Sequence, residues 1–220
     1  MTITGFIKKE LPSILLLLIP FVSIPFVWDL LPDTVPIHFN SSGDPDRYAG
    51  KLTGLLILPC ITVGIYLLFW IIPVIDPKKR VSMDRKPLPA LRFFLILTLT
   101  AFFFVTVGAM IGVEGFFSID RFAPLFVIVI FFGLGNYLSA VQPNYFIGIR
   151  TPWTLEDPEI WRKTHRFGGR LWVFLSSVLL VLWLLLPPAS FESFFVAVII
   201  AMAIIPIVYS YALYASKSKK

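Results

Sequence analysis

The chain alternates between long apolar runs and short polar connections. Five runs contain no Asp, Glu, Lys, Arg or His, and a sixth has only Asp29 near its end. The runs are Leu11–Leu31, Thr53–Ile75, Phe93–Val113, Phe122–Gln142, Leu171–Pro187 and Ser193–Ala215. Most reach or approach the roughly 20 residues that a helix needs to cross about 30 Å of hydrocarbon. The pattern predicts an all-α, polytopic membrane protein with six transmembrane helices.

Composition supports this class, since 57% of residues are hydrophobic and only 15% are charged, which a soluble globule does not show. We expect one membrane domain over residues 1–220. Within it, a two-span unit covers residues 11–75 around an external loop at 32–51. A four-span unit covers residues 93–215 around a cytoplasmic loop at 143–170.

The basic residues segregate by connection. Of 19 lysines and arginines, all but Arg47, Lys51 and Arg121 fall in connections on one side of the membrane. The positive-inside rule places that side in the cytoplasm, so we expect both termini and the loop at 143–170 to be cytoplasmic in a bacterial cell membrane. The net charge of +6 then requires no direct binding of nucleic acid.

The loop at 143–170 is the longest polar interruption. A helix start is typically marked by a capping carboxylate, a proline at the first helical position and an acidic residue in the first turn. Asp157 and Pro158, with the acidic residue that follows them, fit this pattern. We expect a short amphipathic helix from Pro158 to about Phe167, ended by Gly168-Gly169. Its apolar face, with Trp161 and Phe167, would enter the acyl chains. Its basic face, with Arg162, Lys163 and Arg166, would meet anionic lipid.

The same loop carries a dense set of polar and aromatic residues. The planar guanidinium of Arg150 can donate paired hydrogen bonds to loop carbonyls, a carboxylate or a phospholipid headgroup. Partner binding and a simple bracing role for Arg150 and Asn144 are both open. The candidate partner-binding residues are Asn144, Gly148, Arg150, Thr151, Pro152, Trp153, Thr154, Trp161, Arg162, Lys163, His165, Arg166 and Gly169.

The external loop is too polar to enter lipid. Thr34 to Phe39 is expected to be extended and Asn40 to Asp46 to form turns. Its candidate residues are His38, Asn40, Gly43, Asp44 and Asp46. They suit a small receptor surface or a hard-cation site. An ordered turn without metal is favoured, because their spacing differs from the regular calcium-loop pattern.

Gly133, Gly135 and Asn136 form a small, polar face within the fourth apolar run. Close helix packing, with the Asn136 side chain bonding across a helix interface, is the favoured interpretation. A pathway through a small transporter or exporter is the alternative.

Catalysis is not expected. The predicted topology places His38 and His165 on opposite sides of the membrane, and the common metalloprotease, hydrolase and phosphate-loop motifs are missing. The sequence therefore predicts no enzyme, no cofactor and no metal.

Two stretches resemble known families. The segment NYFIGIRTPWTLEDPEIWRKTHRFGGRLWV, preceded by GNYLSAVQP, resembles the signature of the SdpI family of bacterial six-span membrane proteins. The loop PDTVPIHFNSSGDPDRYAGK resembles a domain of unknown function that often precedes that signature. The matching signature positions are Asn144, Gly148, Arg150, Thr151, Pro152, Trp153, Thr154, Trp161, His165 and Gly169.

The resemblance implies a plasma-membrane protein that gives immunity to a secreted toxic peptide. In the founding system such a protein also holds a winged-helix repressor at the membrane. Combined with the predicted topology, this suggests that the external loop meets the extracellular peptide. The cytoplasmic loop would meet a repressor or anionic lipid.

Overall fold

The computed structural model describes residues 3–40, 43–77, 88–112 and 119–217, and it confirms the expected helical membrane fold. Six helices in these residues are long and apolar enough to cross a membrane. They are α1 (Ile3–Val27), α2 (Lys51–Ile75), α3 (Leu88–Ile111), α4 (Ile119–Leu138), α6 (Pro158–Leu185) and α7 (Pro188–Lys217). Most of the basic connection between α2 and α3 lies outside the described residues, and the N-in/C-in orientation stays a prediction.

Many apolar side chains on these helices face outward. Val22, Phe26, Val74 and Leu185 are each more than 60% exposed. Apolar side chains in such positions would cost free energy in water but not in hydrocarbon, so the surface suits a lipid solvent. The chain divides into two compact units, residues 1–68 with 92–126 and residues 69–91 with 127–220.

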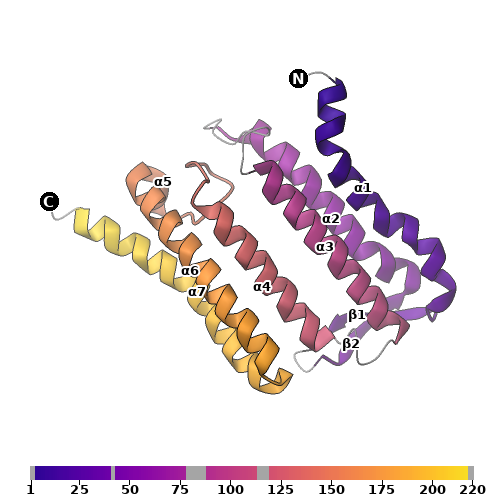
Figure 1. The fold of residues 1–220 in the computed structure, drawn as a ribbon. Coiled ribbons are helices and arrows are strands. Elements are labelled where there is room, and N and C mark those ends of the chain that lie inside the picture. Colours follow the sequence, from indigo (N-terminus) through magenta and orange to yellow (C-terminus); the bar gives the residue numbers. More distant parts are fainter. Residues whose placement is uncertain (1–2, 41–42, 78–87, 113–118, 218–220) are drawn as a thin grey trace. The chain divides into compact units, whose positions relative to one another are not determined.

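The first unit holds a β-hairpin between α1 and α2. A short 3-10 helix, η1 (Trp28–Leu30), precedes strand β1 (Thr34–Phe39), which pairs antiparallel with β2 (Pro45–Gly50) (Figure 1). The expected extended piece at Thr34–Phe39 is therefore confirmed, and it has a partner strand that was not expected.

The hairpin is fixed to the helices by Val35, which is fully buried among Leu31, Leu55, Phe103 and Val107. Gly54 on α2 permits this contact. A Cβ atom built there would lie 2.4 Å from Val35 Cγ2, which is closer than real side chains approach. The loop is therefore an ordered projection of the helical unit.

A buried charge pair lies in the same unit. The Arg92 guanidinium on α3 donates to Oε1 of Glu10 on α1, and both side chains are 2% exposed. The Tyr66 hydroxyl donates to the second carboxylate oxygen of Glu10 at 3.2 Å. In the sequence Arg92 looks like one more loop charge, and the pattern does not reveal this pair.

In the second unit, α4 and α6 pack closely where two glycines meet. A Cβ atom on Gly135 would lie 2.9 Å from the carbonyl oxygen of Gly169, and one on Gly169 would lie 2.7 Å from that of Gly135. Small residues allow backbones to approach in this way in membranes. The expected bond of Asn136 across a helix interface is wrong, because its Nδ2 donates to Phe132 in its own helix.

Helix α6 runs without a break through Gly168 and Gly169 to Leu185, so the predicted helix end at these glycines is wrong. Both glycines are buried, and Gly168 faces Ile149 and Pro206. They serve close packing, and the helical hydrogen bonds continue through them. At 28 residues, α6 is about 42 Å long, so its first turns extend beyond a hydrocarbon core of about 30 Å.

Helix α7 lies along α6 after a tight turn at Pro187 (Figure 1). Trp172 Nε1 donates to the carbonyl of Met202 at 2.8 Å, and Phe167 stacks on Tyr209 with ring centroids 4.3 Å apart. Nearer the turn, Leu179 and Phe191 are buried together. This helix pair carries the loop that precedes α6.

Candidate functional site

The loop after α4 begins with a turn built around Asn144, which is 1% exposed. Its Oδ1 accepts the backbone N–H groups of Phe146 and Ile147, both at 2.7 Å. Its Nδ2 donates to the carbonyls of Gln142 and Ile147 at 2.8 and 3.0 Å. A side-chain amide has two donors and two acceptor lone pairs, so all four are used inside the loop.

His165 joins this loop to α6. Its Nε2 accepts the N–H of Ile149 at 3.0 Å, and its Nδ1 lies 2.8 Å from the carbonyl of Trp161. A backbone N–H can only donate and a carbonyl can only accept, which assigns the proton to Nδ1 and leaves the imidazole neutral. Neither ring nitrogen is available as a base in this arrangement.

Trp161 and Gly148 complete the contact around His165. The Trp161 ring stacks on the imidazole with centroids 4.0 Å apart, and its Nε1 donates to Val141 at 2.8 Å. Gly148 has φ +119°, and a Cβ atom there would lie 2.3 Å from His165 Nε2. Trp161 is 1% exposed, so the prediction that it enters the acyl chains is wrong.

A short helix, α5 (Pro152–Glu156), follows and is capped at its N-terminus by a pair of threonines. The Thr151 hydroxyl accepts from the N–H of Thr154, and Thr154 Oγ1 accepts from the N–H of Thr151 at 2.8 Å. Thr154 also donates to the carbonyl of Ile149 at 3.0 Å. These reciprocal bonds form a capping box and hold the loop against α5.

Ser210 on α7 anchors α5. Trp153 Nε1 donates to the Ser210 hydroxyl at 2.5 Å, and Thr151 Oγ1 lies 3.4 Å from the same oxygen. The Trp153 ring also meets the rings of Tyr211 and Tyr214 at centroid distances of 5.4 and 6.0 Å. These contacts of the Trp153 side chain hold α5 on α7.

Asp157 caps α6 as the sequence predicted. Its Oδ1 accepts from the N–H groups of Glu159 and Ile160 at 2.7 and 3.3 Å. Its Oδ2 accepts from Lys217 Nζ at 2.6 Å. The Lys217 ammonium, followed by the two backbone N–H groups, holds the pKa of the Asp157 carboxyl below its ordinary value.

The predicted partner-binding residues thus divide into two sets. The inner set is buried or turned into the loop and consists of Asn144, Gly148, Thr151, Thr154, Trp161, His165 and Gly169. The outer set is exposed and consists of Arg150, Pro152, Arg162, Lys163 and Arg166, while Trp153 is intermediate.

The outer set is basic. Arg150 Nη1 donates to the carbonyl of Tyr145 at 2.5 Å, and Lys163 pairs with Glu159 at 2.8 Å. Arg162 and Arg166 make no hydrogen bond or ion pair with the described part of the chain. Two free guanidinium groups therefore remain for an anionic ligand or a partner.

The external candidates form two pairs on the hairpin. His38 Nδ1 lies 2.5 Å from Asp46 Oδ1, and both side chains are about half exposed. Asn40 Oδ1 accepts the N–H of Asp44 at 2.9 Å. Gly43 has φ +83°, and a Cβ there would lie 2.6 Å from Cβ of Asp120. No group of three His, Cys, Asp or Glu side chains suited to a metal occurs in the residues that the structure describes.

Comparison with known proteins adds two matches along the chain. Residues 140–210 match the SdpI/YfhL protein family, and residues 15–63 match a domain of unknown function, DUF1648. The immunity protein SdpI of Bacillus subtilis (strain 168) is 24% identical over 175 residues, covering 80% of this chain and 81% of that protein. The SdpI resemblance is confirmed. No solved structure matches the chain.

The SdpI-like segment, residues 140–210, contains the loop, α5, α6 and α7 as far as Ser210. It therefore includes both the loop and its anchor. The DUF1648 match contains the whole hairpin and parts of the flanking helices. The two matches and the six apolar helices identify a multi-pass bacterial membrane protein.

Three residues that hold the site carry no signal in the sequence pattern. Ser210 looked like an ordinary small residue of the last apolar run, and Lys217 counted only as a tail charge. Val141 contributes a backbone carbonyl, which no side-chain pattern reveals. The spacing of Trp153, Tyr211 and Tyr214 gave no signal either, because the pairing depends on how α7 folds back.

Proposed function

We propose that the chain is an immunity protein that protects its bacterium from a secreted toxic peptide. The similarity to the immunity protein SdpI over 80% of the chain carries this proposal. The hairpin supports it, because it gives an ordered, exposed polar surface at the connection between α1 and α2. In this proposal His38, Asn40, Asp44 and Asp46 contact the peptide.

Survival of a toxin-sensitive strain tests the proposal. The gene is expressed in that strain, which is then exposed to related secreted killing peptides. Protection is expected from the parent chain and should fall when His38→Ala and Asp46→Ala are combined. Thr34→Ala, an exposed change at the other end of the hairpin, is the matched control. Absence of protection against every peptide, with normal amounts of protein in the membrane, contradicts the proposal.

The second half of the proposal concerns a cytoplasmic partner. The outer set presents basic side chains around Asn144, Thr154 and His165, whose polar groups already bond within the chain, so a soluble protein can bind it without the loop refolding. A winged-helix repressor with an acidic surface is the partner that the resemblance suggests. Binding of such a repressor would remove it from its operator while toxin is present.

Retention of the repressor in the membrane fraction tests this half separately. Combining Arg162→Glu with Lys163→Glu should release the repressor while protection remains. Thr34→Glu, an exposed change at the end of the hairpin away from the proposed peptide contacts, is the control and should retain it. If a winged-helix repressor tested as the partner stays soluble with the parent chain and toxin, the regulatory half is wrong and immunity is unaffected.

A further inference from the structure

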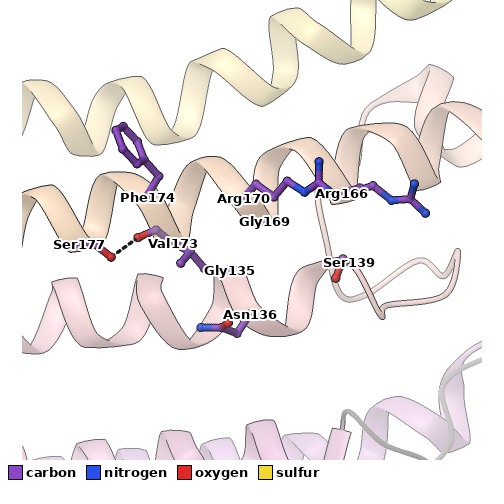
Figure 2. Close-up of a pocket in the computed structure, with 9 residues that line it drawn as sticks. All are labelled: Gly135, Asn136, Ser139, Arg166, Gly169, Arg170, Val173, Phe174 and Ser177. Atoms are coloured by element: carbon purple, nitrogen blue, oxygen red, sulfur yellow. Dashed lines mark hydrogen bonds between the residues drawn. The ribbon is translucent and has the colours of Figure 1, made fainter.

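A groove of about 680 Å³ runs beside the glycine contact of α4 and α6, entirely within the second compact unit. Its α4 wall includes Gly135 and Asn136 (Figure 2). Its α6 wall includes Arg166, Arg170 and Val173. Gly135 and Gly169, which bring the two backbones together, both line it.

The chemistry of the groove changes along α6. Figure 2 shows both guanidinium groups toward the end near Ser139, while Phe174 and Ser177 lie toward the other end. The eleven helical steps from Arg166 to Ser177 span about 16 Å of helix. The groove is therefore cationic at one end and increasingly apolar over a length close to half the hydrocarbon core.

Within the part of the chain that the structure describes, the positive charge in the groove is not neutralised. No carboxylate lines the groove, and neither Arg166 nor Arg170 makes an ion pair with the described residues. Arginine forks match phosphate oxygens in pairs of hydrogen bonds. The two arginines are four positions apart, so they lie on one face of α6 and can both reach one phosphate.

We propose that this groove binds one anionic phospholipid, with its phosphate at Arg166 and Arg170 and an acyl chain along Val173 and Phe174. The exposed Phe174 ring, 64% accessible, favours a lipid over a free phosphate, because a soluble anion has no apolar part to cover it. The site differs from general attraction of the basic outer set to a charged membrane, since it has a wall on each helix.

Native mass spectrometry of the purified full chain tests the site. The probes are dioleoyl phosphatidylglycerol, dioleoyl phosphatidylcholine and glycerol 3-phosphate. We expect one phosphatidylglycerol retained in preference to phosphatidylcholine. Arg170→Gln should weaken retention about fivefold, as should Arg166→Gln. Arg162→Gln, on the same helix but outside the groove, is the matched control and should change it less than twofold.

A second variant tests the apolar wall without touching the charges. Ser177→Phe fills the groove and should weaken phosphatidylglycerol retention. Thermal unfolding of every variant shows that a loss of retention is not a loss of folding. Equal retention of phosphatidylcholine overturns the proposal, as does an equal loss in Arg162→Gln. Displacement by equimolar glycerol 3-phosphate would assign the site to a soluble phosphate and also overturn it.

Discussion

Nε2 of His165 accepts the backbone N–H of Ile149 at 3.0 Å, which joins a loop residue to helix α6 across sixteen positions of sequence. The bond uses the ring nitrogen that would otherwise serve as a base. A residue that looks chemically active in the sequence is therefore part of the frame of the loop.

Replacing His165 should destabilise the protein. His165→Ala leaves the part-buried Ile149 N–H without an acceptor and removes the stack on Trp161, which together cost about 2–4 kcal/mol. Unfolding of the purified protein in mixed detergent micelles measures this. His38→Ala, at an exposed hairpin position, is the control and should change stability little. A fully stable His165→Ala chain that loses protection would instead assign the imidazole a direct functional role.

Gly148 should tolerate no side chain. In Gly148→Ala the backbone at φ +119° is strained by about 1–3 kcal/mol, and the new methyl group collides with His165 Nε2. Gly64→Ala is the control, because nothing lies within 4 Å of its Cβ position, and in the middle of α2 it should stabilise by about 0.5–1 kcal/mol. Thermal unfolding of both variants measures whether Gly148→Ala lowers the stability while Gly64→Ala raises it.

The pair of Glu10 and Arg92 should show strong coupling. Arg92→Met leaves a buried carboxylate without its cation and should cost about 3–5 kcal/mol. Combining it with Glu10→Gln removes the charge and should recover much of that loss. A double-mutant cycle on unfolding free energies measures the coupling, and additive losses would contradict a direct interaction.

Acid should weaken the cap of α6. The pKa of Asp157 is lowered in the folded protein, so its stabilisation is present above the ordinary value of 3.8 and is lost as pH falls through the folded value. Asp157→Ala should cost about 1 kcal/mol at pH 7 through the lost cap. The difference from the parent should stay constant from pH 7 to 5 and shrink below about pH 4. A difference that persists at pH 2 would show that ionisation of Asp157 contributes nothing.

Membrane orientation can be tested at exposed positions. In a chain whose exposed Cys60 is replaced by serine, a cysteine at Asp44 should react with an impermeant maleimide in intact cells. A cysteine at Arg162 should react only after the membrane is permeabilised. Both sites are exposed, so a difference reports sidedness. The reverse pattern would exchange the proposed sensing and regulatory faces.

The sequence predicted the helices well because a span depends on a property summed over about 20 residues, which local errors hardly change. The cap at Asp157 was also predictable, since capping is decided within one turn. The predicted helix end at Gly168-Gly169 is wrong because it also rested on the local sequence alone. Gly169 packs against Gly135 in α4 and Gly168 against Ile149 and Pro206, and no local pattern contains those contacts.

The roles within the loop were equally hard to predict. Asn144, Thr154 and Trp161 carry polar groups, which suggested binding, yet each finds its partners in backbone groups of the folded loop. Only the folded arrangement separates them from Arg162 and Arg166. Polar residue type predicts that a hydrogen bond is needed, but it does not predict whether the protein or a ligand supplies it.

The capping box of Thr151 and Thr154 and the saturated amide of Asn144 have a consequence for how such proteins diverge. A scaffold that closes its own hydrogen bonds lets outward residues mutate without a folding penalty. Arg162 can therefore change sign or size while the turn beneath it keeps its shape. Related chains can therefore differ at a few such positions and share one unchanged frame.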